Sequence, residues 1–264
     1  MMQIRRGVLS LIVAGLLALL PQSGDSIELG LQVTPGKLEV SIPSGSTYNV
    51  PITVHSSGFD ATHVQATMID FGVSQSGDYQ FLKVGESPYT MMRWASIRPR
   101  EFDLAPGTTQ QVQLTIAVPS DSKLTGEYAG MVFFQTRPER HGGGVAFSAR
   151  VASKIYETIP NTVKIDGAIT KMSTAKSQGG QVFRIVFHNT GNAHIYARGT
   201  LIVQKGNNVV YQVAMPENML VERNGIRVIE VKGKTLDAGS YQAIATVDYG
   251  GKTETAGQIT FDVH

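Results

Sequence analysis

Apolar and polar residues alternate along most of this sequence, and this period of two constrains its fold more than any other feature. The clearest example is the run at 145–157, VAFSARVASKIYE, which follows three consecutive glycines. Because successive side chains of a strand point to opposite faces, one face of this run is apolar and the other carries basic residues. The apolar face holds Val145, Phe147, Ala149, Val151 and Ile155, and the other holds Arg150, Lys154 and Tyr156. The run predicts one long β-strand in the middle of the chain.

Runs of the same kind precede and follow it, separated by turns rich in Gly, Pro, Asn and Ser. They lie at 31–42, 48–54, 64–71, 112–118 and 126–135, and then at 182–187, 195–203, 209–213, 226–231, 241–247 and 258–263. Residues 75–97 are less regular, and we expect a long loop or an extra short strand there. About seven short strands in each half are typical of a Greek-key sandwich. The sequence therefore predicts an all-β protein with two tandem immunoglobulin-like β-sandwich domains.

The first 26 residues are expected to be a cleaved secretory signal peptide. Arg5 and Arg6 precede an apolar run at 7–20, which is shorter than the roughly 20 apolar residues that a membrane span needs. The small residues Gly24 and Ser26 favour cleavage after Ser26. An uncleaved anchor is the alternative. We therefore expect the mature protein to be periplasmic or secreted.

Cleavage at this point leaves enough chain for two domains of roughly 100–150 residues each. We place the first domain at 27–160 and the second at 161–264, because Pro160 and Asn161 separate two alternating runs. The chain has no cysteine, so packed cores alone must stabilise both domains. Its 23 basic and 21 acidic residues nearly balance. This balance gives no support to nucleic-acid binding, which needs a clustered basic face.

The sequence contains no recognisable catalytic motif. It has no cysteine nucleophile, no Gly-x-Ser-x-Gly elbow and no phosphate-binding loop. His188 and His194 flank a turn, but no further metal ligands lie in register with them. We therefore predict that the protein is not an enzyme and has no metal, cofactor or small-molecule substrate. Phe81, Tyr89 and Trp94 are interpreted as covering one end of the first core, with an exposed binding cluster as the alternative.

Three segments resemble the periplasmic chaperones of the chaperone–usher pilus pathway. They are VTPGKL at 33–38, the segment 96–107 with its proline and its Ala-Pro-Gly turn, and the apolar positions at 145–149 followed by Lys154. The resemblance implies two immunoglobulin-like domains that meet at an angle. It also implies that the last strand of the first domain completes the fold of a pilin subunit, and that a basic pair binds the C-terminal carboxylate of that subunit.

The resemblance implies specific site residues and partners. The client-strand residues are Val145, Phe147, Ala149 and Val151, and the residues that bind the client carboxylate are Lys37 and Lys154. The partners are pilin-like or surface protein subunits, with an outer-membrane usher as a further one. Ala149 is small for a donor residue, and Lys37 stands where the family has an arginine, which weakens bidentate carboxylate binding. The acidic and arginine-containing stretch that the family carries before its sixth strand is absent here.

The segment 119–134 is also similar to a group of Gram-positive surface proteins that pair a peptidoglycan-binding sandwich with a host-binding one. On that resemblance, the protein is a cell-surface binding or structural module with no chaperone activity. The two hypotheses differ in the strand at 145–157. A chaperone presents this strand as an accessible edge, whereas a surface module packs its apolar face into its own core.

Overall fold

The structure is a computed structural model that describes residues 30–140 and 146–264. Within these ranges the regular secondary structure consists of strands β1 to β20, so the predicted all-β class is confirmed. No helix in the described ranges is suited to crossing a bilayer. Val145 and the expected signal peptide at 1–26 lie outside the described residues.

Two sheets form the N-terminal sandwich. In spatial order, the first holds β1 (Leu31–Thr34), β3 (Thr47–Ser56), β8 (Thr109–Ala117) and β6 (Ala95–Arg98). The second holds β2 (Lys37–Ser41), β12 (Arg150–Thr158), β9 (Glu127–Thr136), β4 (Thr62–Val73) and β5 (Tyr79–Leu82), with β7 (Glu101–Leu104) also paired to β4. The short strands β10 (Glu139–Arg140) and β11 (Ala146–Phe147) pair with each other.

Alternating apolar residues fill the space between these two sheets. Ile52 and Val54 on β3 are completely buried, and so are Leu114 and Ile116 on the neighbouring strand β8. These residues belong to one continuous cluster that also receives Ile155 from β12. Side chains at every second position of a strand share a face, so the sequence pattern directly produces this core.

The C-terminal sandwich has its own pair of sheets and its own core. One sheet holds β13 (Gly167–Ser177), β14 (Gly180–Asn189) and β18 (Ile226–Lys232). The other holds β16 (Asn208–Ala214), β15 (Ile195–Lys205), β19 (Gly239–Asp248) and β20 (Thr255–Val263), with β17 (Met219–Val221) also paired to β15. The two main apolar clusters share no residue, which confirms the prediction of two sandwiches. The exact domain limits at 27, 160 and 161 stay predictions.

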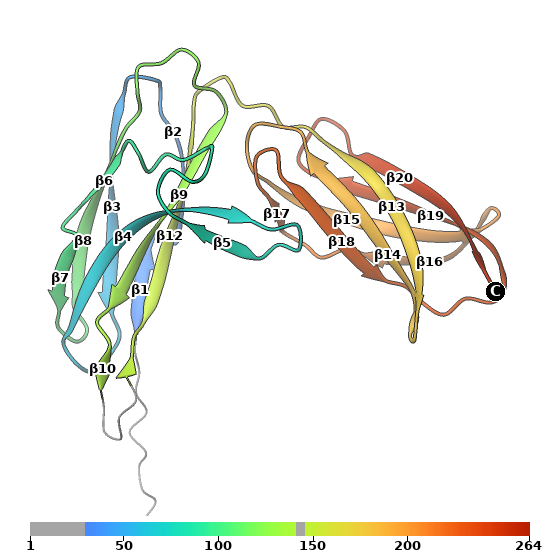
Figure 1. Ribbon diagram of the computed structural model, residues 1–264, viewed down its shortest axis with the longest axis horizontal. Coiled ribbons are helices and arrows are strands. Elements are labelled where there is room, and N and C mark those ends of the chain that lie inside the picture. The colour runs from blue at the N-terminus through green and yellow to red at the C-terminus, as the bar shows by residue number, and fades with distance from the viewer. Residues whose placement is uncertain (1–29, 141–145) are drawn as a thin grey trace, which may run out of the picture.

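The two sandwiches meet at an angle, and the hairpin formed by β4 and β5 reaches into the space between them (Figure 1). β4 pairs with β9 as far as Ile69 and then continues alongside β5 alone. Phe71, in this second part of β4, belongs to a third apolar cluster with Met131, Phe133 and Tyr156. At the hairpin tip, the Val228 amide of β18 donates a 2.8 Å hydrogen bond to the Gln75 carbonyl, so the hairpin touches both sandwiches.

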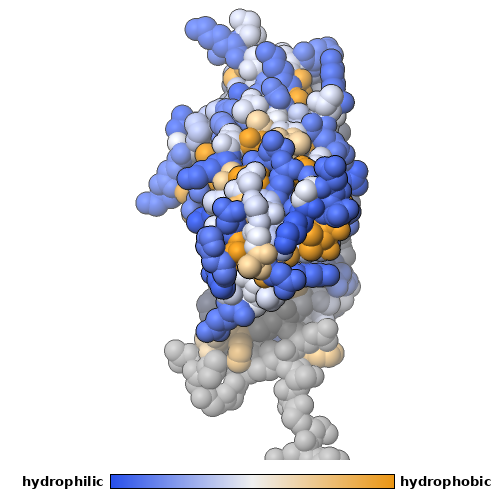
Figure 2. Space-filling model, turned by 90° about the vertical axis from the view of Figure 1, so that its right-hand side faces the viewer, coloured by the Kyte–Doolittle hydropathy of each residue, from blue (hydrophilic) through white to orange (hydrophobic). Residues whose placement is uncertain are grey.

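Seen from the C-terminal sandwich, the surface is mainly hydrophilic, with small separate apolar areas (Figure 2). This view agrees with the apolar cluster that lies between the two sheets of that sandwich. Most of the large apolar side chains of this half are therefore used for packing.

The prediction of a single strand at 145–157 is wrong. Its described part divides into β11, which pairs with β10, and β12, which pairs with β9. At the break, the Ser148 hydroxyl donates to the Thr136 carbonyl (2.7 Å) and the Ala149 amide donates to the Thr136 hydroxyl (2.9 Å). Side chains therefore replace part of the regular backbone ladder there.

The irregular region 75–97, for which we expect a long loop or an extra short strand, contains the short strand β5 and the start of β6. The structure also contains a long strand that the pattern does not predict. β13 was not predicted at all, because many of its side chains are exposed and its apolar alternation is weak. It is nevertheless paired with β14 over most of its length.

Candidate functional site

The strand β12 is fully paired on one side and only partly paired on the other. It pairs with β9 from Arg150 to Thr158, and with β2 only from Lys154 to Thr158. The preceding strand β1 pairs with β3 in the facing sheet instead. Among the described strands, none pairs with β12 at 150–153 on the β2 side. This stretch is an open sheet edge at the end of β12 that lies away from the junction of the two sandwiches, because Thr158 at the other end pairs with Glu127.

The register shows which backbone groups face this open edge. The Ala149 carbonyl accepts a hydrogen bond from the Thr136 amide of β9 (2.9 Å), whereas the Lys154 amide donates to Gly36 on the opposite side (3.0 Å). Backbone groups of successive strand residues point alternately to the two sides. The amide and carbonyl groups of Arg150 and Ala152 therefore point to the open edge, and those of Val151 and Ser153 point to β9.

The four predicted client-strand residues lie in different environments. Phe147 is on β11 and its side chain is 39% exposed. Ala149 and Val151 are half-buried and pack against the core of the N-terminal sandwich. Val145 lies outside the described residues. The structure thus places Phe147 at the surface beside the open edge and directs Ala149 and Val151 inward.

Lys37 and Lys154 are brought together by the parallel pairing of β2 and β12. Their Cα atoms are direct partners in the register, and directly paired residues project to the same face of a sheet. Each ammonium group, however, has its own neighbours. Lys37 Nζ is 2.7 Å from Glu39 Oε1 and 4.9 Å from the centre of the Tyr196 ring. Lys154 Nζ donates to the Tyr79 hydroxyl at 2.7 Å.

The hydrogen bond between Lys37 and Glu39 raises the pKa of Lys37 and lowers the pKa of Glu39. Both groups are therefore charged at neutral pH, and the positive charge of Lys37 is largely balanced locally. A client carboxylate at this place would have to compete with Glu39 for Lys37. Shared binding of one carboxylate by the two lysines stays a prediction.

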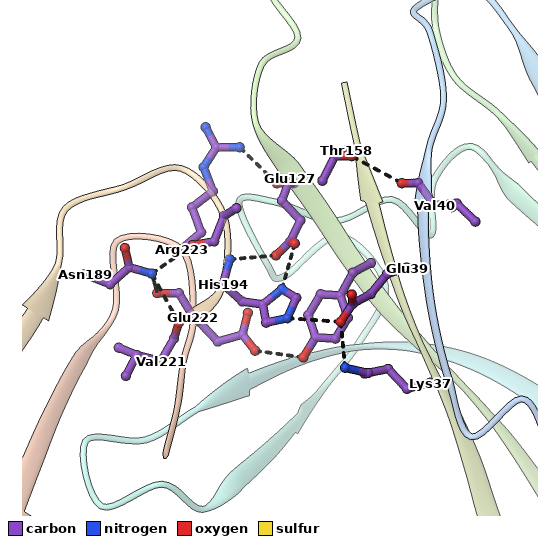
Figure 3. Close-up of polar contacts among 12 residues, drawn as sticks. Lys37, Glu39, Val40, Glu127, Thr158, Asn189, His194, Val221, Glu222 and Arg223 are labelled. Carbon is purple, nitrogen blue, oxygen red and sulfur yellow. Dashed lines mark hydrogen bonds and ion pairs between the residues drawn. The ribbon is translucent and has the colours of Figure 1, made fainter. Parts of the chain in front are cut away.

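A buried histidine, for which the sequence predicts no role at this site, joins the two sandwiches close to Lys37 (Figure 3). The His194 amide donates to Glu127 Oε1 at 2.9 Å, and its ring Nδ1 lies 2.7 Å from Glu127 Oε2. Its Nε2 lies 3.5 Å from Glu39 Oε1. The ring also stacks on Tyr156, with centroids 3.9 Å apart. His194 comes from the C-terminal sandwich and its three partners come from the N-terminal one, so this cluster fixes the junction.

Further contacts reinforce the same junction. Arg223 Nη1 donates to the carbonyl groups of Thr125 (2.8 Å) and Glu127 (2.9 Å). The Tyr156 hydroxyl donates to Glu222 Oε1 at 3.4 Å. Burial raises the pKa of Glu222 to about 7, an effect that nearby His194 reduces and Glu127 increases. Burial also raises the pKa of the Tyr156 hydroxyl.

Another carboxyl group is buried within the N-terminal sandwich itself. Glu157 on β12 is completely buried, and neither of its carboxylate oxygens has a hydrogen-bond partner among the described residues. Burial raises the pKa of Glu157 to about 7, with a further contribution from Glu127. Removing a carboxylate from water disfavours its charged form, so this group keeps its proton over a wider pH range than an exposed glutamate.

The sequence contained little signal for this junction cluster. The sequence places His194 only near His188, across a turn, whereas its actual partners lie far away in sequence on β2 and β9. Within the described ranges, no group of three or more His, Cys, Asp or Glu residues is arranged to hold a metal ion. The cluster is a set of ion pairs and hydrogen bonds between two sandwiches.

Comparison with known proteins gives matches only among solved structures. No protein-family model matches the chain, and no curated protein matches it. One similar structure is the class 5 fimbrial chaperone CfaA, with 10% identity, a TM-score of 0.49 and coverage of 89% of this chain and 99% of that chain. A chain of the chaperone–tip adhesin complex of CFA/I fimbriae has 11% identity, a TM-score of 0.49 and coverage of 88% and 98%. A chain of the Salmonella enterica SafA pilin–SafB chaperone complex has 10% identity, a TM-score of 0.47 and coverage of 90% and 98%.

Proposed function

We propose that this protein is an exported chaperone that binds pilus or surface subunits by offering the open edge of β12 to an extended segment of the client. The observation that carries this proposal is the stretch 150–153, which is paired with β9 but has no strand partner on its other side among the described strands. Strand addition supplies main-chain hydrogen bonds for affinity and side-chain contacts for specificity. The backbone groups of Arg150 and Ala152 are the ones available for it.

The proposed client is a pilin-like or surface subunit, because the sequence resembles the pilus chaperones. The similar solved structures include a chaperone with a pilin and a chaperone with a tip adhesin. The open edge ends at Lys154, which lies next to Lys37 in the register. A client segment that ends there would place its terminal carboxylate near two ammonium groups, and charge-assisted hydrogen bonds are about twice as strong as neutral ones.

One observation favours the second candidate, a surface module without chaperone activity. Ala149 and Val151 already pack into the core of their own sandwich, as in an ordinary strand. If all the useful apolar surface of β12 is committed in this way, only its backbone and Phe147 remain for a client. The two candidates therefore differ in whether β12 accepts a further strand at all.

The test uses a labelled peptide that can form a strand. The strand probe is a fluorescein-labelled peptide with two lysines, four Val-Thr repeats and a free C-terminal carboxylate. Its control has N-methyl groups on alternate amides, which removes half of its hydrogen-bond donors. We expect the protein to bind the strand probe and to lose binding to the N-methylated control. Equal binding of both peptides, or of neither, would contradict strand addition.

Two variants connect this test to the structure. Ala152→Pro removes one amide that points to the open edge, and proline is tolerated at such positions because no ladder bond to β9 is lost. It should weaken probe binding and leave the fold intact. Phe147→Asp should abolish probe binding, because it places a charge beside the open edge. It should not unfold the protein, because Phe147 is exposed. Unfolding of Phe147→Asp would instead identify Phe147 as a core residue.

A further inference from the structure

The hairpin formed by β4 and β5 carries two exposed aromatic residues close to side chains on the outer face of β12. Tyr79 and Phe81 occupy alternate positions on β5 and are 42% and 57% exposed. Strand β5 pairs only with β4 and is the last strand of its sheet. Large aromatic side chains at the surface are normal when isolated, but these two are close to the same short stretch of β12.

Both aromatic residues contact cations at the two ends of the open stretch. Arg150, its first residue, lies with its guanidinium carbon 5.7 Å from the Phe81 ring centre and 3.5 Å from the Phe133 ring centre. Lys154, which follows its last residue, donates to the Tyr79 hydroxyl. The hairpin thus lies over the outer face of the sheet, where Phe81 packs on Phe133 of β9, and the side chains of Arg150 and Lys154 connect it to the open stretch of β12.

The hairpin is also held firmly in this place. Phe81 packs edge-on against Phe133, with centroids 5.1 Å apart, and Tyr79 packs on Phe71 at 5.9 Å. The Gln75 carbonyl at the tip is bonded to β18 of the other sandwich. Because rigid aromatic side chains lose little conformational entropy on binding, a fixed pair of this kind is suited to contact a partner.

We propose that Tyr79 and Phe81 form a wall of the client site and contact apolar or aromatic side chains on the outer face of a strand added to β12. This inference rests on the proposed function. A strand added at 150–153 has one row of side chains facing the core and one row on the outer face, which is the face of Arg150 and Lys154. The occupant is an extended polypeptide segment, because Arg150 and Lys154, whose side chains contact the two aromatic residues, bound the same stretch of β12 that has unpaired backbone groups.

The test compares two probes on the intact protein. The second probe replaces the threonines of the strand probe by tyrosines, which places aromatic rings on the outer face. We expect the tyrosine probe to bind about two- to tenfold more tightly, the range of an aromatic pair contact. Phe81→Ala should remove this advantage and leave the affinity for the threonine probe nearly unchanged. Tyr48→Ala is the matched control, because Tyr48 is similarly exposed but lies on β3 of the facing sheet.

The outcomes separate this inference from the proposed function. If neither probe binds, the proposed function fails and the inference falls with it. If both probes bind and the tyrosine advantage is absent, or survives in Phe81→Ala, the inference alone is overturned. Should Phe81→Ala unfold, Phe81→Leu preserves apolar packing on Phe133 and must still remove the advantage. If Phe81→Ala converts a dimer of this chain to a monomer, with no effect on either probe, the hairpin serves self-association and the inference is wrong.

Discussion

The buried carboxyl group of Glu157 predicts a specific pH dependence of stability. Its pKa is raised from 4.5 to about 7 by burial, and neither of its oxygens has a hydrogen-bond partner among the described residues. Below pH 4.5 the group is protonated in both the folded and the unfolded protein, so its ionisation does not affect the free energy of unfolding. Between pH 4.5 and 7 the unfolded chain loses its proton while the folded chain keeps it, and the free energy of unfolding therefore falls. Above pH 7 both states are ionised and the loss becomes constant.

The size of the effect follows from the shift. One pKa unit corresponds to about 1.4 kcal/mol, so the loss above pH 7 amounts to about 3 kcal/mol. Glu157→Gln removes the titration and keeps the shape of the side chain. The free energy of unfolding of the variant, relative to the natural protein, should therefore rise by about 3 kcal/mol between pH 4 and pH 8. Only this change with pH matters, because a constant offset reports the packing of the new amide.

The assay is urea unfolding followed by tryptophan fluorescence. Trp94 is the single tryptophan and packs against the N-terminal core, so its signal reports the sandwich that contains Glu157. The exposed Glu254→Gln provides the matched control and should show a flat difference across the same pH range. A difference for Glu157→Gln that stays within about 0.5 kcal/mol from pH 4 to pH 8 would refute the reasoning, because that is the size of ordinary surface effects.

Three further predictions concern the core, the junction and Lys154. Leu114→Ala should destabilise the N-terminal sandwich by about 2–5 kcal/mol in the same urea assay, since Leu114 is completely buried; a cost below about 1 kcal/mol would contradict its placement in the core. His194→Ala should lower the free energy of unfolding by roughly 2–5 kcal/mol and increase proteolysis of the connection at 159–166, because Glu127 then loses its buried partner. Unchanged proteolysis and stability would show that the cluster does not fix the junction. Lys154→Ala should weaken binding of the strand probe by about tenfold and binding of its C-terminally amidated form much less, as expected for a hydrogen bond to a charged group. Equal losses of affinity for both forms would exclude a carboxylate site at Lys154.

The alternation of side chains was sufficient to predict the class and most strands of this protein. Residues such as Ile52, Leu114 and Phe183 are fully buried at alternate positions, and burial of this kind is what a period of two encodes. β13 escaped prediction because it lies mostly exposed at the edge of its sheet. The break at Ser148 also escaped, because it depends on the hydroxyl of Thr136, which approaches only after β9 and β12 have paired.

The candidate site was only partly predictable, because many of its contacts also form between strands that are distant in sequence. The pattern placed Lys154 on the outer face of its strand, and the pairing with Lys37 agrees with a shared location. It gave no information on Glu39 and Tyr79, which bind the two ammonium groups, because these contacts cross between strands. His194 meets Glu127 across 67 positions of sequence, and local periodicity contains no record of such a contact.

The central claim, that the edge of β12 accepts an extended client segment, is tested most directly by residue-resolved amide hydrogen exchange. The amides of Arg150 and Ala152 point to the open edge, whereas those of Val151 and Ser153 point to β9. In the free protein we predict faster exchange at Arg150 and Ala152 than at their two neighbours. Saturation with the strand probe should slow exchange at Arg150 and Ala152 and leave Val151 and Ser153 unchanged. Bound probe with no new protection at Arg150 and Ala152 would contradict strand addition at β12.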